Sequence, residues 1–342
     1  MIGPMHFRCL TLAVLTVSCG ALVLQAAEPA TDKPKPPPPT AYTDPAKTDD
    51  DFVYQGEFAG ENEGKKYGVR IIALGDGKFE AVGFEGGLPG EGWQGQWSDV
   101  THTQGERAQG DSFVSFKTEK LKAKALGDSI DVLTLQDEKK FEMNRVRRIS
   151  PTMDAKAPEG AIVLFDGKDK NGFPGSRISE DGLLMEGATS GEKYTDFTLH
   201  LEFRLPYIPK GRSQGRGNSG LYLQGRYEVQ VLDSFGLEGK DNECGGIYKI
   251  AVPKVNMCLP PLVWQTYDVD FTAAKFDAEG KKTANAKVTV KHNGVLIHEN
   301  QELPQTTASA PTSTEANTPG PIYLQNHGNP VRYRNIWLKP RA

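Results

Sequence analysis

Short runs in which apolar and polar residues alternate recur along most of this chain, and glycine-rich breaks separate them. Residues 67–74, 78–84 and 129–135 are such runs, and a Gly-Asp-Gly break lies at 75–77. Alternation at period two is typical of half-buried β-strands, whereas hardly any stretch has the periodicity of a helix. The 37 Gly and 23 Pro among 342 residues also favour a turn-rich chain. The sequence therefore predicts an all-β protein with antiparallel sheets.

The alternating runs fall into two blocks, which suggests two domains. We expect a smaller antiparallel β domain of unknown role at residues 51–150 and a larger domain at 161–342. The nine or ten strands of the larger block predict a sandwich of two sheets. A His-Asn-Gly sequence at 292–294 predicts a hairpin turn within it. Proline-rich residues 28–50 and the segment 151–160 are the expected linkers.

Residues 1–27 have the layout of a secretory signal peptide. Arg8 precedes an apolar run at 9–27 that ends in small residues. A lipoprotein signal with Cys19 as the lipidated residue is the alternative. We therefore expect an exported protein, periplasmic or extracellular, which is either free or anchored through Cys19. No other run approaches the ~20 apolar residues that a spanning helix needs.

Charge and cysteine usage narrow the expected partners. The formal net charge is −4 and no block of basic residues occurs, which argues against nucleic acid, because neutralising phosphates takes clustered Lys and Arg. Removal of the signal would leave Cys244 and Cys258. In an oxidising compartment these two residues are a candidate disulfide, and two unpaired, buried thiols are the alternative. Their spacing is not that of a zinc site.

The run at residues 217–236, GNSGLYLQGRYEVQVLDSFG, contains two strands that share a tight turn. On the second strand, apolar side chains alternate with Arg226, Glu228 and Gln230, so the three polar side chains share one face. A guanidinium, a carboxylate and an amide in a row suit a polyhydroxylated ligand. A solvated outer face is the alternative, since such residues are ordinary there.

Four segments of the larger block carry a family likeness. They are residues 161–173 (AIVLFDGKDKNGF), 217–236, 244–249 (CGGIYK) and 320–340 (GPIYLQNHGNPVRYRNIWLKP). In this order they resemble the 3-keto-disaccharide hydrolase family, and the resemblance covers essentially residues 161–342. It implies a concanavalin-like jelly-roll whose concave sheet holds a carbohydrate. The preceding β module resembles one that accompanies this domain in planctomycete-type proteins, without an assigned activity.

The resemblance implies chemistry on sugars whose C3 hydroxyl has been oxidised to a ketone, so a glycoside 3-dehydrogenase is the implied functional partner. The ketone acidifies the C2 proton, a base removes it, the enolate expels the C1 oxygen substituent, and water adds to the resulting enone. Such a site needs one base with a pKa near the working pH, and donors or a metal at the developing enolate oxygen. It does not need the carboxylate pair of ordinary glycosidases. A non-catalytic carbohydrate-binding module on the same face is the alternative.

His327 and Glu228 are the candidate catalytic residues. His327 is the only histidine inside a matched segment, alternates with Gln325 and Tyr323 on an expected late strand, and can titrate near neutrality. Glu228 would act as the base or as an anchor for sugar hydroxyls. The expected substrate-binding residues are Arg226, Gln230, Asn218, Tyr248, Lys249, Arg332, Arg334 and Asp233.

Structural roles are the alternative for these candidates, for example solubility of an edge strand for the two late arginines. Glu228, Asp233 and His327 would also make a mixed nitrogen and oxygen set that suits a divalent metal. No contiguous ligand motif supports such a metal.

Overall fold

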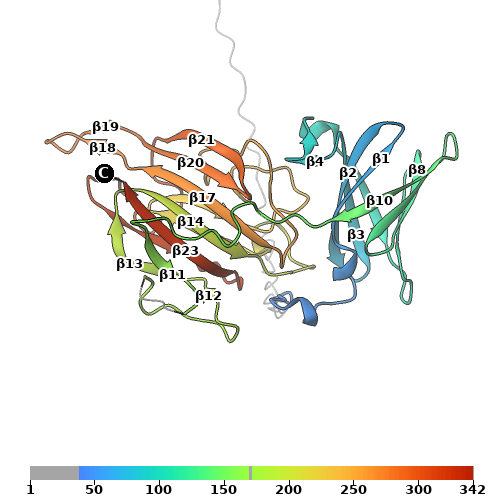
Figure 1. Cartoon of the computed structure of the whole chain (residues 1–342), viewed down its shortest axis with the longest axis horizontal. Helices are drawn as coiled ribbons and strands as arrows, with labels where there is room; N and C mark the ends of the chain where they lie inside the picture. The colour runs from blue at the N-terminus through green and yellow to red at the C-terminus, as the bar shows by residue number, and fades with distance from the viewer. Residues whose placement is uncertain (1–37, 169–171, 342) are drawn as a thin grey trace, which may run out of the picture. The chain divides into compact units, whose positions relative to one another are not determined.

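The computed structural model describes residues 38–168 and 172–341. Regular structure in these ranges is nearly all β, with only short 3-10 helices besides (Figure 1), so the all-β prediction is confirmed. The expected signal peptide, with Cys19, lies outside the described residues. No helix among the described residues is long and apolar enough to cross a membrane. The 3-10 helices are Pro45–Lys47, Phe52–Tyr54, Trp97–Asp99 and Ser213–Gly215.

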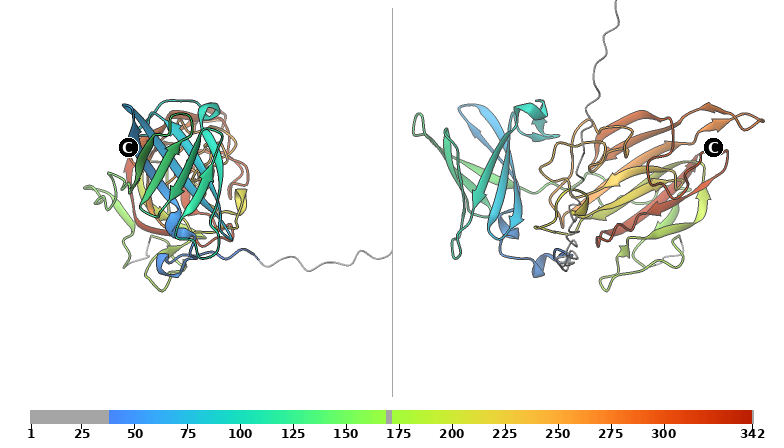
Figure 2. Two further views of the ribbon diagram at one scale, coloured as in Figure 1. Left: turned by 90° about the vertical axis from the view of Figure 1, so that its right-hand side faces the viewer. Right: turned by 180° about the vertical axis from the view of Figure 1, so that it is seen from behind.

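Eight antiparallel strands close into a barrel, in the order β1-β10-β9-β8-β7-β6-β3-β2 (Figure 2). Every second side chain points inward, and Phe58, Ile71 and Phe79 are fully buried in its apolar cluster. The strands are β1 Gly56–Asn62, β2 Lys65–Gly75, β3 Lys78–Glu85, β6 Thr101–Glu106, β7 Val114–Lys117, β8 Leu121–Ala125, β9 Ser129–Thr134 and β10 Lys140–Val146. Between β3 and β6 lie the short strands β4 Leu88–Pro89 and β5 Gly92–Trp93.

The rest of the chain builds two larger antiparallel sheets (Figure 1). A seven-stranded sheet has the order β11-β23-β14-β17-β20-β21, with β12 paired to β23, and a four-stranded sheet has the order β13-β22-β15-β16. The first comprises β11 Ile162–Phe165, β12 Leu184–Met185, β14 Asp196–Arg204, β17 Trp264–Thr272, β20 Ala286–His292, β21 Val295–Leu303 and β23 Arg332–Arg341. The second comprises β13 Ala188–Tyr194, β15 Ser219–Leu223, β16 Tyr227–Val231 and β22 Gly320–Leu324. A further pair is β18 Lys275–Phe276 and β19 Lys282–Ala284.

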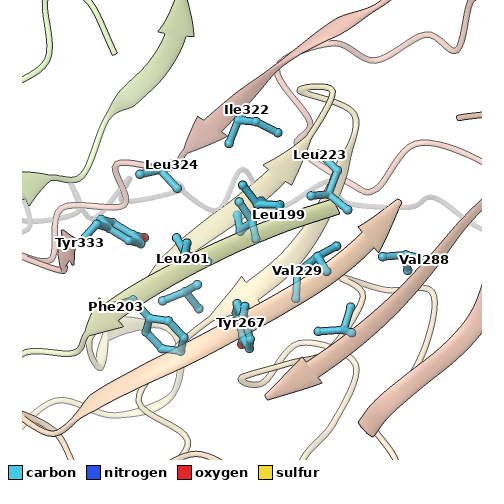
Figure 3. Close-up of a cluster of buried hydrophobic side chains, with 14 of the residues drawn as sticks. Leu199, Leu201, Phe203, Leu223, Val229, Tyr267, Val288, Ile322, Leu324 and Tyr333 are labelled. Carbon is cyan, nitrogen blue, oxygen red and sulfur yellow. The ribbon is translucent and has the colours of Figure 1, made fainter. Parts of the chain in front are cut away.

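The sandwich core lies between these two sheets (Figure 3). Leu199, Leu201 and Phe203 alternate along β14, and Leu223 and Val229 come from the four-stranded sheet. All five are at most 1% exposed, and burying an aliphatic or aromatic side chain of this size contributes roughly 1.5–3 kcal/mol. This core orients β15 and β16, so that their remaining side chains point away from it.

The hairpin expected at residues 292–294 joins β20 to β21. Asn293 and Gly294 have φ values of 50° and 80°. A two-residue type I′ turn requires positive φ at both central positions, which Asn-Gly tolerates best. The turn prediction is therefore confirmed.

Candidate functional site

A cluster of polar side chains lies on the face of the four-stranded sheet that points away from the core. Glu228 on β16 is paired in register with Tyr222 on β15, which is paired in turn with Tyr323 on β22. Residues that are directly paired across strands point to the same face. The two neighbouring pairs point into the core instead, and they are Leu221 with Val229 and Leu223 with Tyr227.

Glu228 is the carboxylate of this cluster. The Tyr222 hydroxyl donates a hydrogen bond of 2.8 Å to Oε2 of Glu228, and the residue is only 2% exposed. Burial raises the pKa of Glu228 to about 7, while the hydrogen bond from Tyr222 acts in the opposite direction. A carboxyl group with a pKa near neutrality can both take up and release a proton at the working pH.

Gly220 makes the space that the carboxylate of Glu228 occupies. A Cβ atom added at Gly220 would lie 2.2 Å from Oε1 of Glu228, so any other residue there would displace the carboxylate. The requirement for glycine is therefore a close approach between neighbouring strands. Sequence reasoning missed Gly220 and Tyr222. The signal that was available for Tyr222 is its alternation with Leu221 and Leu223 on the first strand of the run.

Three amide side chains continue the polar face beside Glu228. Nε2 of Gln230 donates to Oδ1 of Asn218 at 3.0 Å, and Nδ2 of Asn218 donates to the carbonyl oxygen of Gln214 at 2.9 Å. Oε1 of Gln230 is buried and has no hydrogen-bond partner among the described residues. Leaving a buried acceptor unpaired is costly, and a ligand hydroxyl would supply the missing donor.

The loop that follows β22 borders this cluster. Nε2 of Gln325 donates to the Tyr222 hydroxyl at 3.2 Å, and Oδ1 of Asn329 accepts from the backbone N–H of Asn218 at 2.8 Å. His327 lies between these two residues and is exposed. It belongs to the loop, so its expected place on a strand is wrong. The turn residues Gly328, with φ 80°, and Pro330 follow it and are incompatible with a continued strand.

Tyr248 and Lys249 follow a segment that runs along the free edge of β16. The backbone N–H of Tyr248 donates to the carbonyl oxygen of Glu228 at 3.1 Å, and Ile247 forms a β-bridge with Val229. Tyr248 is therefore held beside the Glu228 strand. The ammonium group of Lys249 is exposed and lies 3.6 Å from a carboxylate oxygen of Asp241.

Arg226 and Asp233 have partners other than the Glu228 carboxylate. Arg226 occupies the turn between β15 and β16 and donates to the carbonyl oxygens of Thr314 and Thr318, which precede β22. Asp233 lies beyond the end of β16, and its Oδ2 accepts a 2.6 Å hydrogen bond from Nε of Arg216. Arg226 therefore binds the loop that precedes β22, and Asp233 neutralises the buried guanidinium of Arg216.

Arg332 and Arg334 lie on the other sheet. Both belong to β23, and the side chain between them, Tyr333, is fully buried in the sandwich core. The two guanidinium groups therefore point to the outer face of the seven-stranded sheet. There Arg332 lies 3.2 Å from Glu186, and Arg334 lies 2.7 Å from Glu202. The structure does not bring either residue to the Glu228 cluster.

The three suggested metal ligands lie apart, and the two cysteines are unpaired. Glu228, Asp233 and His327 are not gathered as a metal would require, since no group of three such ligand side chains occurs in the described residues. The proposed set therefore does not fit a metal. Cys244 and Cys258 are both buried and free, which corresponds to the unpaired alternative.

The chain is similar to proteins of known structure. A family model described as the 3-keto-alpha-glucoside-1,2-lyase-like domain matches residues 160–339. A protein from Parabacteroides distasonis ATCC 8503, described as a proposed glycosyl hydrolase, is 35% identical over 54% of this chain and 85% of its own, with a TM-score of 0.50. A second protein of that organism with the same description is 22% identical over 54% of this chain and 95% of its own, with a TM-score of 0.41. No curated protein matches.

Proposed function

Because the chain belongs to the family of the 3-keto-alpha-glucoside-1,2-lyase-like domain, we propose that residues 160–339 cleave glycosides whose C3 hydroxyl has been oxidised to a ketone. The family match and the solved neighbour support a glycosyl hydrolase-like enzyme that acts on sugars. One observation carries the finer proposal. Glu228 is a buried carboxyl group with a pKa of about 7, set among hydrogen-bonding side chains.

Glu228 is the base in this proposal. Tyr222 occupies its Oε2, so Oε1 is the oxygen that takes the C2 proton of the sugar. The electron pair left on C2 forms an enolate with the C3 ketone, and the enolate then expels the C1 oxygen substituent. The leaving oxygen takes the proton held by Glu228. Water then adds its hydroxide to C1 of the enone and its proton to C2, so one water is consumed for each bond cleaved. Since Glu228 is 2% exposed, the side chains around it have to rearrange for a ring carbon to reach Oε1.

The neighbours of Glu228 suit a sugar with many hydroxyl groups. Burial and the adjacent carboxylate of Glu228 raise the pKa of Tyr222, so Tyr222 keeps its proton and remains a donor. The unpaired Oε1 of Gln230 would accept a hydrogen bond from a sugar hydroxyl. Asp233, the other acidic residue of this run, is engaged by Arg216. These contacts favour one base over the carboxylate pair of ordinary glycosidases.

The proposal also covers how the 3-keto substrate is produced and where in the cell the protein acts. A dehydrogenase that oxidises the C3 hydroxyl must produce the substrate, because the cleavage itself begins from the ketone. Export to the periplasm or beyond, free or anchored through Cys19, is proposed from residues 1–27.

The substrate requirement gives a direct test. The protein is incubated with 4-nitrophenyl glucoside and, separately, with its 3-keto derivative, and nitrophenol release is measured above the rate without protein. We expect release from the ketone alone. Release from both substrates would indicate an ordinary glycosidase, and release from neither would contradict the proposed activity and leave a carbohydrate-binding module.

The pKa of Glu228 predicts the pH dependence. Since the base must be deprotonated, kcat/KM should rise with pH and level off above about 7. Tyr222→Phe removes the hydrogen bond that lowers this pKa, so the inflection should move to higher pH. The measurement is a pH–rate profile of both proteins, corrected for spontaneous cleavage. If the inflection stays at the same pH in the variant, the group that controls the pH dependence is not Glu228.

A further inference from the structure

A cavity of about 310 Å³ lies inside the barrel. The residues that line it all come from residues 62–143, so it is independent of the Glu228 cluster. Its volume falls at the lower end of the range of small-molecule pockets, roughly 300–1,000 Å³.

The sizes of the inward-facing residues explain why the cavity exists. An eight-stranded barrel is just wide enough either to be filled by its own side chains or to hold one small ligand. Phe79, the second residue of β3, is fully buried and fills the lumen where β3 begins. Further along β3, and on β8, the inward positions are taken by Ala81, Gly83 and Ala123, which are opposite Ile71, Val69 and Phe116 in the register. These small residues leave that part of the barrel interior unfilled.

The unfilled end also carries apolar side chains that are not fully covered. Tyr67, Leu121 and Phe141 line the cavity, remain partly exposed and pack against the buried barrel cluster. The ring centroids of Tyr67 and Phe141 are 6.2 Å apart. Removing such apolar surface from water is favourable, and an apolar molecule in the lumen would do so.

The charges at the cavity restrict the class of ligand. Its lining includes the carboxylates of Glu85 and Asp99 and, among the described residues, no Lys, Arg or His. The Glu85 carboxylate forms an exposed ion pair with Lys65 at 3.2 Å, whereas Asp99 forms no ion pair in the described part of the chain. An anion in the cavity would therefore meet the unpaired negative charge of Asp99. Thr101 and Thr134 supply hydroxyl groups near the same end. We propose that the barrel binds one uncharged, mainly apolar small molecule, whose polar group lies at this end.

A matched pair of variants on β8 tests the proposal in the full chain. Ala123→Leu adds a side chain inside the lumen, whereas Lys122→Leu adds the same side chain at the adjacent exposed position. The probe is N-phenyl-1-naphthylamine, which is uncharged and fluoresces more strongly in apolar surroundings. We expect wild type and Lys122→Leu to bind it equally, and Ala123→Leu at least tenfold more weakly. Ala81→Leu is a second filling variant, and thermal unfolding checks that each variant is folded.

Competition on the wild-type protein gives a second measurement that needs no variant. We expect 1-decanol to displace the probe and decanoate to displace it at least tenfold less well, because decanoate would bring a negative charge to the carboxylate of Asp99 and into an apolar lumen. Glycoside cleavage should stay unchanged in the folded variants. A failure of ligand binding in the barrel would therefore leave the catalytic proposal untouched, and the reverse also holds. Absence of probe binding to wild type, equal binding by folded filling variants, or equal displacement by alcohol and acid would overturn the proposal.

Discussion

Replacement of Glu228 by Gln lowers kcat on a 3-keto glycoside by about 10²–10⁴-fold, the contribution that is typical of a positioned general base. The amide has nearly the same shape as the carboxyl group, but it cannot take a proton from C2. Its neutral side chain also suits a position that is 2% exposed and that already raises the pKa of the carboxyl group. The fold should therefore be retained, and KM should change much less than kcat.

The matched control is Glu302→Gln, which makes the same change at an exposed glutamate of β21. It should leave kcat and KM unchanged. Both constants are measured by the initial rate of aglycone release, with circular dichroism and thermal unfolding to verify the fold. Full activity in Glu228→Gln would remove Glu228 from the proton transfer.

His327→Ala distinguishes the two candidate bases. His327 is exposed, and no hydrogen bond among the described residues joins it to Glu228. We therefore expect a smaller loss of kcat than in Glu228→Gln. A larger loss in His327→Ala, with Glu228→Gln nearly active, would move the base to the loop after β22.

Asp233→Asn lowers the free energy of unfolding by about 3–5 kcal/mol, the typical cost of removing one partner of a buried ion pair. The side chains of Arg216 and Asp233 are 6% and 0% exposed, and the two groups are 2.6 Å apart. The guanidinium of Arg216 would be left buried without its countercharge. Its Nη2 has no hydrogen-bond partner in the described part of the chain, so no other described group there would replace Asp233. Urea unfolding at neutral pH measures the change from the midpoint and the slope.

The control for this prediction is Glu299→Gln, which breaks the exposed ion pair with Lys254. It should change stability little, because exposed pairs contribute little. The folded fraction of Asp233→Asn should keep the wild-type KM, since Asp233 is engaged away from the Glu228 carboxylate. An unchanged free energy of unfolding together with a raised KM would restore Asp233 as a substrate-binding residue.

The sequence was most informative where alternation and turn chemistry act locally. Alternation at period two identified the strands, and it placed Glu228 and Gln230 on the face away from the core. The Asn293–Gly294 turn followed from the need for positive φ. These inferences depend on neighbours in the chain, so a sequence alone supports them.

Contacts between distant segments could not be predicted in this way. Alternation shows that Arg332 and Arg334 share a face, but not to which sheet that face belongs. The pairing of Asp233 with Arg216 and the space left by Gly220 depend on register and on chain positions outside β16. Closure of the barrel, and the cavity within it, depend on which strands pair, and short alternating runs leave that choice open.

If cleavage proceeds through removal of the C2 proton, hydrogen from the solvent must enter the sugar at C2, and isotope incorporation detects this. The reaction is run in D₂O on the 3-keto glycoside, and the released sugar is examined by NMR. Incubation of the 3-keto sugar product with Glu228→Gln measures exchange that does not depend on the base. We expect one deuterium at C2 of the sugar released by the wild-type protein, because C2 receives its new proton from the solvent. A released sugar that keeps its original hydrogen at C2 would contradict it.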